Sequence, residues 1–402
     1  MFVASLSARS WVAQDKPHIP EGNTVKITRS GSIAALALIG TLALAGCAAT
    51  SDGGSTNAPS ASADTTVTGP KIDSTLAGTI TSGGSSAQAN AETAWTAAFN
   101  AQASGVTINY DKSQGSGGGV TNFLSGSYDF AGSDAALKSD QYASGQTLCA
   151  GGAPIDLPAY LSGVALVYNL SGVTDLKLSS ATVAKIFTLQ IKTWDDAAIK
   201  ADNPTATLPS TPITVVTRSD GSGTTANFTK YMSDTQPSIF TVAPTNAWPI
   251  AGTSGQQGGA GVVAAVTAGA GAIGYADQSS VGSLAQAKVQ VGTGKDYVAY
   301  SAAGATAAFD AASSTAAQGD GDMTQVIDYS KITDKSAYAI PLLSYIITCT
   351  VHKDATQGAL TKAYLGFIES TVGQAVAAKN AGSAPLPDSV LKEAQKSIAL
   401  IK

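Results

Sequence analysis

The chain has 402 residues, of which 44% are hydrophobic and 13% are charged, and its formal net charge is −5. This size allows two domains with buried cores, and the absence of a basic stripe argues against nucleic-acid binding. The two histidines, His18 and His352, are too few for a histidine metal cluster, and a Ser-His-Asp triad would depend on His352 alone.

Residues 26–47 are predicted to be a targeting segment. Lys26 and Arg29 form its positive flank, an apolar run extends from Ile33 to Leu44, and Cys47 closes the segment after Leu-Ala-Gly. The apolar run is too short for a secure transmembrane helix. The end of the segment resembles the lipobox of bacterial lipoproteins, which implies that Cys47 receives a diacylglycerol and becomes the first residue after cleavage. A plain secretory signal with a chance cysteine is the alternative.

The stretches on either side of this segment differ from it in composition. Residues 1–24 include Asp15 and Glu21, which do not suit the positive end of a signal peptide. We therefore predict that translation begins near Val25 and that the preceding stretch is an upstream extension; a tryptic peptide from that stretch in the primary product would contradict this. Residues 48–71 are rich in Ser, Thr, Gly, Ala and Asp without an apolar period, which predicts a flexible tether.

After the tether, the chain is predicted to repeat one local arrangement: a strand, a turn of glycine and serine, and the start of a helix. Such a turn offers backbone N–H donors at the positive end of a helix, where anions bind. The predicted strands are Thr79–Ile80, Val106–Tyr110 and Tyr128–Ala131, the turns are Ser82–Gln88, Gln114–Gly119 and Gly132–Asp134, and the helices contain Ala91–Phe99 and Val120–Leu124.

The remainder of the chain also alternates between strands and helices. This alternation predicts an α/β fold with mostly parallel pairing, and a ligand outside the carboxyl ends of the strands. The predicted strands are Tyr160–Tyr168, Ile213–Thr217, Gly271–Asp277 and Leu342–Val351, and the predicted helices are Ala181–Phe187, Thr225–Met232, Gly258–Ala268, Leu360–Phe367 and Pro387–Leu400.

One of the glycine turns also carries a cation. The segment from Arg218 to Thr224 reads Arg-Ser-Asp-Gly-Ser-Gly-Thr and lies between a predicted strand and a predicted helix. The guanidinium of Arg218 can donate hydrogen bonds to two oxygens at once, and Ser222 and Thr224 add hydroxyl donors. A small tetrahedral oxyanion suits this set of donors. An ordinary turn with a serine N-cap is the alternative.

Together these motifs resemble the phosphate-binding lipoproteins of bacterial phosphate ABC transporters. The resemblance implies an α/β fold of the two-lobed periplasmic-binding-protein (type II) flytrap kind, in which each lobe is a mixed sheet flanked by helices and the ligand lies in the cleft between them. Lobe I would comprise residues 72–165 and 340–402, and lobe II residues 166–339. The matching segments are Ser82–Gln88, Gly115–Val120, Asp129–Leu137, Ile191–Ile199, Arg218–Thr224, Gly271–Asp277 and Leu386–Val390.

The resemblance implies a phosphate site built by both lobes, with donors at helix starts and one buried carboxylate. The carboxylate would be that of Asp134, and Asp220 would pair with Arg218 and fix its rotamer. No catalytic residue, cofactor or metal ligand is implied. The phosphate-binding residues would be Ser86, Ala87, Ser116, Asp134, Arg218, Ser222, Gly223 and Thr224.

Two positions of this site depart from the family pattern. Ser86-Ala87 stands where the family often has Thr-Phe, and Gly117 stands where serine is common. Neither change removes an essential donor, because Ser86 keeps a hydroxyl and backbone N–H groups do not depend on the side chain. Local packing near Ala87 is placed in doubt, and helix capping is an alternative role for Ser86, Ser116 and Asp134.

The implied function is high-affinity binding of inorganic phosphate at the extracytoplasmic face of the cell membrane. The protein would be attached through the lipid on Cys47 and would deliver phosphate to the permease subunits of an ABC transporter; neither enzymatic activity nor a nucleic-acid partner is implied. The site is split along the sequence between the two lobes, which cross over near Val164 and Ile340. We therefore expect the lobes to close over the ligand by a hinge motion.

Three other functions stay open. A sulfate or molybdate binder would have to place an oxyanion without a hydrogen against Asp134. A phosphatase lacks support, because neither a Gly-x-Ser-x-Gly elbow nor a Walker A sequence nor a histidine-activated nucleophile is found. A surface antigen would share the fold alone.

Cys149 and Cys349 are the cysteines that remain once Cys47 carries a lipid. An exported protein is exposed to oxidation, and both residues lie close to the expected hinge strands. We therefore predict a disulfide between them, with two buried thiols as the alternative.

Overall fold

The computed structural model describes residues 70–402. The targeting segment with Cys47, the upstream extension and nearly all of the tether lie outside the described residues. Within residues 70–402 no helix is both long and apolar enough to span a membrane. The same range contains no group of three or more histidine, cysteine or acidic side chains that could hold a metal ion.

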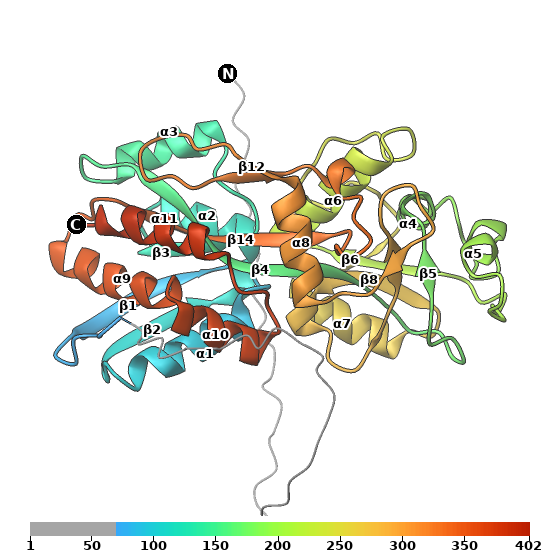
Figure 1. Cartoon of the computed structure of the whole chain (residues 1–402), viewed down its shortest axis with the longest axis horizontal. Helices are drawn as coiled ribbons and strands as arrows, with labels where there is room; N and C mark the ends of the chain where they lie inside the picture. The colour runs from blue at the N-terminus through green and yellow to red at the C-terminus, as the bar shows by residue number, and fades with distance from the viewer. Residues whose placement is uncertain (1–69) are drawn as a thin grey trace, which may run out of the picture. The chain divides into compact units, whose positions relative to one another are not determined.

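The described chain alternates between helices and strands from β1 to α11 (Figure 1). The helices are α1 Ala89–Asn100, α2 Gly115–Leu124, α3 Ser139–Leu148, α4 Ser180–Phe187, α5 Ala197–Asp202, α6 Gly223–Thr235, α7 Gly258–Ala268, α8 Ala302–Ala312, α9 Ala355–Ile368, α10 Thr371–Ala381 and α11 Asp388–Ala399. The strands are β1 Ala77–Gly84, β2 Gly105–Asp111, β3 Phe130–Ser133, β4 Pro154–Tyr168, β5 Lys177–Leu178, β6 Thr214–Arg218, β7 Ser254–Gln256, β8 Ala272–Asp277, β9 Ala285–Gln286, β10 Lys288–Gln290, β11 Tyr297–Val298, β12 Ser313–Thr315, β13 Gln325–Ile327 and β14 Pro341–Cys349.

The largest sheet is mixed, with the strand order β2-β1-β3-β14-β4-β8-β6-β7 and with β9 paired to β4. Pairing is parallel at the two ends, within β2-β1-β3 and within β8-β6-β7. It is antiparallel in the middle, from β3 through β14 and β4 to β8. The mixed sheet agrees with the expected fold. The expectation of mostly parallel pairing is wrong at the centre, because β4 and β14 run beside each other in opposite directions.

The strands β4 and β14 link the two halves of the sheet, and Figure 1 shows them side by side between β3 and β8. The first part of β4, up to Gly163, pairs with β14, whereas residues 164–168 pair with β8. The amide of Val164 donates to the carbonyl of Ile340 at 2.9 Å, where the change of partner occurs. The half with β1–β3 and the half with β6–β8 are called lobe I and lobe II below.

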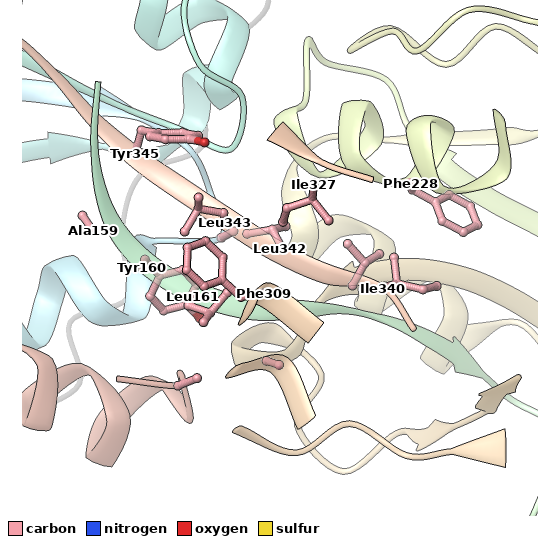
Figure 2. Packing of buried hydrophobic residues seen from close by; sticks show 14 of the residues in the cluster. Ala159, Tyr160, Leu161, Phe228, Phe309, Ile327, Ile340, Leu342, Leu343 and Tyr345 are labelled. Atoms are coloured by element: carbon pink, nitrogen blue, oxygen red, sulfur yellow. The ribbon is translucent and has the colours of Figure 1, made fainter. Parts of the chain in front are cut away.

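The core extends along these two linking strands. Figure 2 shows Tyr160 and Leu161 of β4 close to Leu342 and Leu343 of β14, and all four side chains are buried. Fifteen residues of β4 are buried in succession, which is the pattern of a strand that is covered on both faces. The crossing is therefore built from long apolar strands, with few positions at which a polar side chain is found.

The hairpin of β12 and β13 makes a further connection between the lobes. It follows α8, in the stretch that the sequence predicts to be lobe II, yet the amide of Met323 in its loop donates to the carbonyl of Asp156 on β4 at 3.0 Å. The carboxylate of Asp322 accepts from the amide of Asp156 at 3.0 Å. This loop of the hairpin thus packs on the first part of β4, one of the two linking strands.

Cys149 and Cys349 are joined by a disulfide in the structure, with their Cα atoms 5.3 Å apart and a sequence separation of 200. Cys149 follows α3 and Cys349 ends β14. In denatured, unreduced protein that begins after Cys47, we expect a thiol reagent to label no cysteine. Reduction should lower the free energy of unfolding by about 3 kcal/mol, because a disulfide restricts the unfolded chain. Two labelled thiols per chain would contradict this prediction.

A buried acid on α1 predicts an unusual dependence of stability on pH. Glu92 Oε2 accepts from the Tyr364 hydroxyl at 2.8 Å, and its other oxygen has no partner in the described part of the chain. Burial raises the pKa of Glu92 to about 8, against a smaller opposing effect of the Tyr364 hydrogen bond. Because the pKa is higher in the folded state, the contribution of Glu92 to the free energy of unfolding is fully present below about pH 4.5. This contribution is lost as the pH rises through about 8.

Replacing Glu92 with glutamine should remove this dependence. We expect the wild type to lose a few kcal/mol more unfolding free energy than Glu92→Gln between about pH 5 and about pH 9, since one pKa unit corresponds to about 1.4 kcal/mol. Urea unfolding of both proteins at the two pH values measures the difference. Glu393→Gln, at an exposed position of α11, is the matched control. Parallel pH profiles of wild type and Glu92→Gln would contradict the prediction.

Candidate functional site

The predicted phosphate-binding residues lie where strands end and helices begin, and the structure brings segments of both lobes together there. Gly117 N donates to Gly221 O at 2.8 Å, and Thr224 Oγ1 donates to Asp134 Oδ2 at 2.9 Å. The predicted residues come from the loop after β1 (Ser86, Ala87), the start of α2 (Ser116), the end of β3 (Asp134), and the turn from β6 into α6 (Arg218, Ser222, Gly223, Thr224).

Three serine hydroxyls of this site act as acceptors toward the backbone. Ser86 Oγ accepts from Gly259 N at 3.3 Å, and Ser116 Oγ accepts from Asp134 N at 3.1 Å. Ser222 Oγ caps α6 by accepting a hydrogen bond from the backbone N–H of Thr225. None of the three hydroxyl hydrogens has an acceptor among residues 70–402. Each of these serines can therefore donate to an additional oxygen.

The start of α6 adds backbone donors. The first amides of an α-helix have no acceptor within the helix, and the helix dipole makes this end positive. Gly223 begins α6 directly after the capping residue Ser222. A Cβ at Gly223 would lie 2.6 Å from Asp134 Cβ and 2.6 Å from Ser116 Oγ. Glycine is therefore required here, because it lets the backbone of lobe II approach lobe I.

Arg218 is buried at the end of β6 and is held by a carboxylate. Its Nε donates to Asp220 Oδ1 at 2.7 Å, and its Nη2 pairs with Asp220 Oδ2. Gly258 N also donates to Asp220 Oδ1, at 3.1 Å. Burial acts to raise the pKa of Asp220, but the hydrogen bonds and charge of Arg218 outweigh it, so the pKa lies below its ordinary value. Within the described residues Nη1 of Arg218 has no acceptor, which leaves it available to an anion.

Tyr275 of β8 contacts the same end of β6. Its hydroxyl accepts from Arg218 N at 3.2 Å and bonds Thr225 Oγ1 at 2.6 Å. These two contacts give Tyr275 a structural role, which is to hold the turn that carries Arg218. Burial, the largest effect, raises the pKa of Tyr275 to about 12, so the hydroxyl stays protonated near neutral pH.

Asp134 is buried and accepts hydrogen bonds from three hydroxyls. Ser85 and Ser344 donate to Oδ1, the latter at 2.7 Å, and Thr224 donates to Oδ2 at 2.9 Å. The guanidinium of Arg218 pairs with Asp220, as the resemblance implied, and makes no hydrogen bond to Asp134 in the described part of the chain. The residues that hold Asp134 are therefore hydroxyls, two of which the sequence did not single out.

Two predicted donors are engaged with neighbours. Ala87 N donates to Ser85 Oγ at 3.1 Å, within the turn after β1. Thr224 Oγ1 donates to Asp134, as described above. These two donors would have to leave their present acceptors before they could bind an anion. The serine hydroxyls, the α6 amides and Nη1 of Arg218 need no such change.

The lobes also contact each other around the site. Asn227 Nδ2 of α6 donates to the carbonyl of Asp134 at 2.6 Å, and Gln257 Nε2 donates to Ser113 O at 2.8 Å. Asn90 Nδ2 of α1 donates to Ser279 O at 2.8 Å. A cavity of about 370 Å³ adjoins this region, and it shares Ser116, Asp134 and Gly223 with the site. The two lobes are thus in contact with each other around the site.

This set of groups suits a tetrahedral oxyanion that carries a hydrogen. It offers hydroxyl, amide and guanidinium donors together with one carboxylate, which can only accept when it is ionised. His352, the one histidine of residues 70–402, lies 3.3 Å from Thr348 Oγ1 on β14, and burial lowers its pKa. No histidine of residues 70–402 therefore forms a hydrogen bond with the hydroxyls of the site.

The chain is similar to several known proteins. A family model described as a PBP superfamily domain matches residues 69–371. Phosphate-binding protein PstS 3 of Mycobacterium leprae is 33% identical over 369 residues, covering 91% of this chain and 96% of the relative. Phosphate-binding protein PstS 2 of Mycobacterium tuberculosis is 34% identical over 383 residues, with the same coverage. The crystal structure of a phosphate-binding protein from Stenotrophomonas maltophilia shares the fold, with a TM-score of 0.61 and 22% identity over 80% of this chain and 94% of that one.

Proposed function

The chain belongs to the PBP superfamily and, within it, to the PstS-type phosphate-binding proteins, and on this premise we propose that it binds inorganic phosphate outside the cytoplasm and delivers it to an ABC transporter permease. The observation that carries the proposal is the meeting of unpaired donors from both lobes beside one buried carboxylate. The phosphate relatives named above support the same ligand.

In this proposal the groups divide into donors and one acceptor. The serine hydroxyls, the α6 amides and Arg218 donate to the phosphate oxygens, and Asp134 Oδ2 accepts the hydrogen that phosphate carries near neutral pH. Ala87 N and Thr224 Oγ1 join the donors after changing partners. The proposed residues remain Ser86, Ala87, Ser116, Asp134, Arg218, Ser222, Gly223 and Thr224, with Asp220 in support.

Calorimetric titration tests the proposal directly. Phosphate should bind to one site per chain, and sulfate at the same ionic strength should give far weaker binding. Equal affinity for the two anions would favour the general oxyanion binder, and the absence of binding to either would overturn the proposal. An assay with a generic phosphate ester should show no hydrolysis, since we propose a binding protein without enzymatic activity.

The proposal includes attachment of the protein to the membrane. Lipid on Cys47 would place the folded part at the extracytoplasmic face, at the end of the tether. Mass spectrometry of protein extracted from membranes should find a diacylglycerol on a chain that begins at Cys47. Recovery of an unmodified Cys47 in secreted protein would contradict this part of the proposal.

Release and capture of phosphate would require the lobes to separate. The contacts across the site, such as Gly117 N to Gly221 O at 2.8 Å, exist only when the lobes are closed. Because phosphate would contact both lobes, it should favour the closed arrangement. Small-angle scattering with and without phosphate should therefore show a smaller radius of gyration in its presence. An unchanged radius would contradict the proposed hinge, with lobe boundaries near Val164 and Ile340.

A further inference from the structure

A glutamine on the helix side of the site fixes the direction of one hydrogen bond to Asp134. Gln88 is buried, and its Nε2 donates to Ser344 Oγ at 2.6 Å and to Tyr345 O at 2.8 Å. An amide nitrogen donates only, so Ser344 Oγ accepts from Gln88. The single hydrogen of Ser344 then goes to Asp134 Oδ1, which lies 2.7 Å away.

A second serine is directed in the same way. Ser85 Oγ accepts from Ala87 N at 3.1 Å, so its own hydrogen is left for Asp134 Oδ1, with which it is hydrogen bonded. Both lone pairs of Oδ1 are thereby filled by serines of lobe I. Neither serine can reverse its role without leaving a buried N–H of Gln88 or Ala87 unpaired, and an unpaired buried donor costs about 1–3 kcal/mol.

The other oxygen of Asp134 faces lobe II. Thr224 at the start of α6 donates to Oδ2 at 2.9 Å, and no other donor to Oδ2 is found within residues 70–402. A carboxylate oxygen accepts about two hydrogen bonds, so Oδ2 keeps one position for a further hydrogen. The two oxygens of Asp134 thus have different surroundings: Oδ1 is fixed inside lobe I, and Oδ2 is presented at the contact with lobe II.

The strand β14 places Ser344 for this contact. Ser344 is a fully buried hydroxyl between the apolar residues Leu343 and Tyr345–Ile347. The pairing of β14 with β4 shifts between Ser344 and Tyr345, because Ser344 pairs with Tyr160 and Tyr345 pairs with Pro158. Packing alone would be served better by an apolar residue, since burial of a hydroxyl is unfavourable unless it is hydrogen bonded.

We infer that Gln88, Ser344 and Ser85 are positioning residues that set the selectivity of the site for a hydrogen-bearing oxyanion. By filling Oδ1 they orient Asp134 so that one acceptor, on Oδ2, faces the ligand. Monohydrogen phosphate supplies the matching hydrogen, and sulfate has none. The inference rests on the proposed phosphate site, and it adds three residues that are not members of the proposed phosphate-binding set.

Replacing Ser344 with alanine tests the inference. Without this donor Asp134 can turn, and the discrimination should weaken: we expect the ratio of the sulfate to the phosphate dissociation constant to fall by about tenfold or more, since one net hydrogen bond to a charged group contributes about 1.5–3 kcal/mol. A general loosening of the fold would weaken the binding of both anions alike and leave the ratio of their dissociation constants unchanged. Ser344→Thr keeps the hydroxyl and should restore most of the ratio.

A matched control and a second variant complete the test. Ser162 on β4 is equally buried, and its hydroxyl has no partner in the described residues, so Ser162→Ala should leave the ratio at the wild-type value. Where Ser344→Ala fails to fold, Ser85→Ala reports on the other donor to Oδ1 and should lower the ratio in the same way. Competition titration of phosphate and sulfate at one ionic strength measures every variant.

A double substitution gives a sharper readout. In Asp134→Asn the two serine donors should hold the amide oxygen at the Oδ1 position and turn the NH₂ toward the ligand, which favours sulfate. In Ser344→Ala/Asp134→Asn this orientation is lost, so the two substitutions should not be additive in their effect on sulfate affinity. Additive effects would overturn the inference but not the proposed function. The same holds if the wild type is selective and Ser344→Ala leaves the ratio of the two dissociation constants unchanged. A wild type that binds no phosphate would overturn the proposed function as well.

Discussion

Replacing Asp134 with asparagine should reduce the preference of the protein for phosphate over sulfate by about a hundredfold or more. In the wild type, sulfate would set one of its oxygens against Asp134 Oδ2, so that two negative, desolvated atoms face each other without a hydrogen between them. Such a contact costs several kcal/mol. Phosphate carries at least one hydrogen near neutral pH and donates it to the carboxylate. We therefore expect the wild type to prefer phosphate by several orders of magnitude.

The asparagine variant should lose phosphate affinity and gain sulfate affinity. Its amide has nearly the shape of the carboxylate, and the three hydroxyls around Asp134 remain to hold it. The NH₂ can donate to sulfate, but it cannot accept from phosphate. Competition titration of both anions with wild type and variant at one ionic strength measures the change. Asp310→Asn, which removes an exposed carboxylate on α8, is the control for net charge.

A wild type that binds sulfate nearly as well as phosphate would show that Asp134 does not face the ligand. The same conclusion would follow from an Asp134→Asn variant with unchanged selectivity. Both results are independent of the overall affinity, because each depends on a ratio of two dissociation constants for one protein.

Replacing Arg218 with alanine should weaken phosphate binding by roughly a hundredfold, since a charge-assisted hydrogen bond contributes about 1.5–3 kcal/mol and a guanidinium can make two of them. The fold should persist, because Tyr275 and the pairing of β6 with β7 hold the strand end through the backbone of Arg218. Removal of the guanidinium has a second effect: Asp220 loses its partner and leaves an uncompensated negative charge near the anion.

The double variant Arg218→Ala/Asp220→Asn separates these two effects. If repulsion by Asp220 contributes, the double variant should recover part of the affinity that Arg218→Ala loses, and the remainder is the direct contribution of the guanidinium. Arg218→Lys keeps the charge without the planar fork, so it should lie between wild type and alanine. Lys392→Ala on α11, which contributes no residue to the site, is the control for the loss of one positive charge.

Titration calorimetry with phosphate measures all five proteins, and circular dichroism checks their fold. A loss smaller than roughly tenfold, or about 1.4 kcal/mol, in a folded Arg218→Ala would show that Arg218 lies outside the site. The result is distinct from the selectivity test, because Arg218 donates equally to phosphate and to sulfate.

The sequence by itself determined the local parts of this protein. The turns after β1 and β6 and the start of α2 follow from glycine, serine and capping residues within a few positions of each other, so the strand-turn-helix arrangement could be predicted without knowing what packs around it. Strands such as β4 and β14 were found as apolar runs. The helices α3, α5, α8 and α10 could not be predicted in this way, because α3 carries few apolar residues, α5 has only 6 residues, and α8 and α10 consist largely of small residues, which leave a weak helical period.

The tertiary structure alone decided how the carboxylate is held. Ser85 and Ser86 are neighbours in one turn, and only the packing shows that Ser85 contacts Asp134 while Ser86 meets α7. Ser344 lies 210 residues from Asp134 in sequence, and it reaches the site because β14 pairs antiparallel with β3 and β4 in the middle of the sheet. A lone serine in an apolar strand was visible in the sequence, but its partner was not. Strand order and register arise from contacts between distant segments, and no local pattern of residues specifies them.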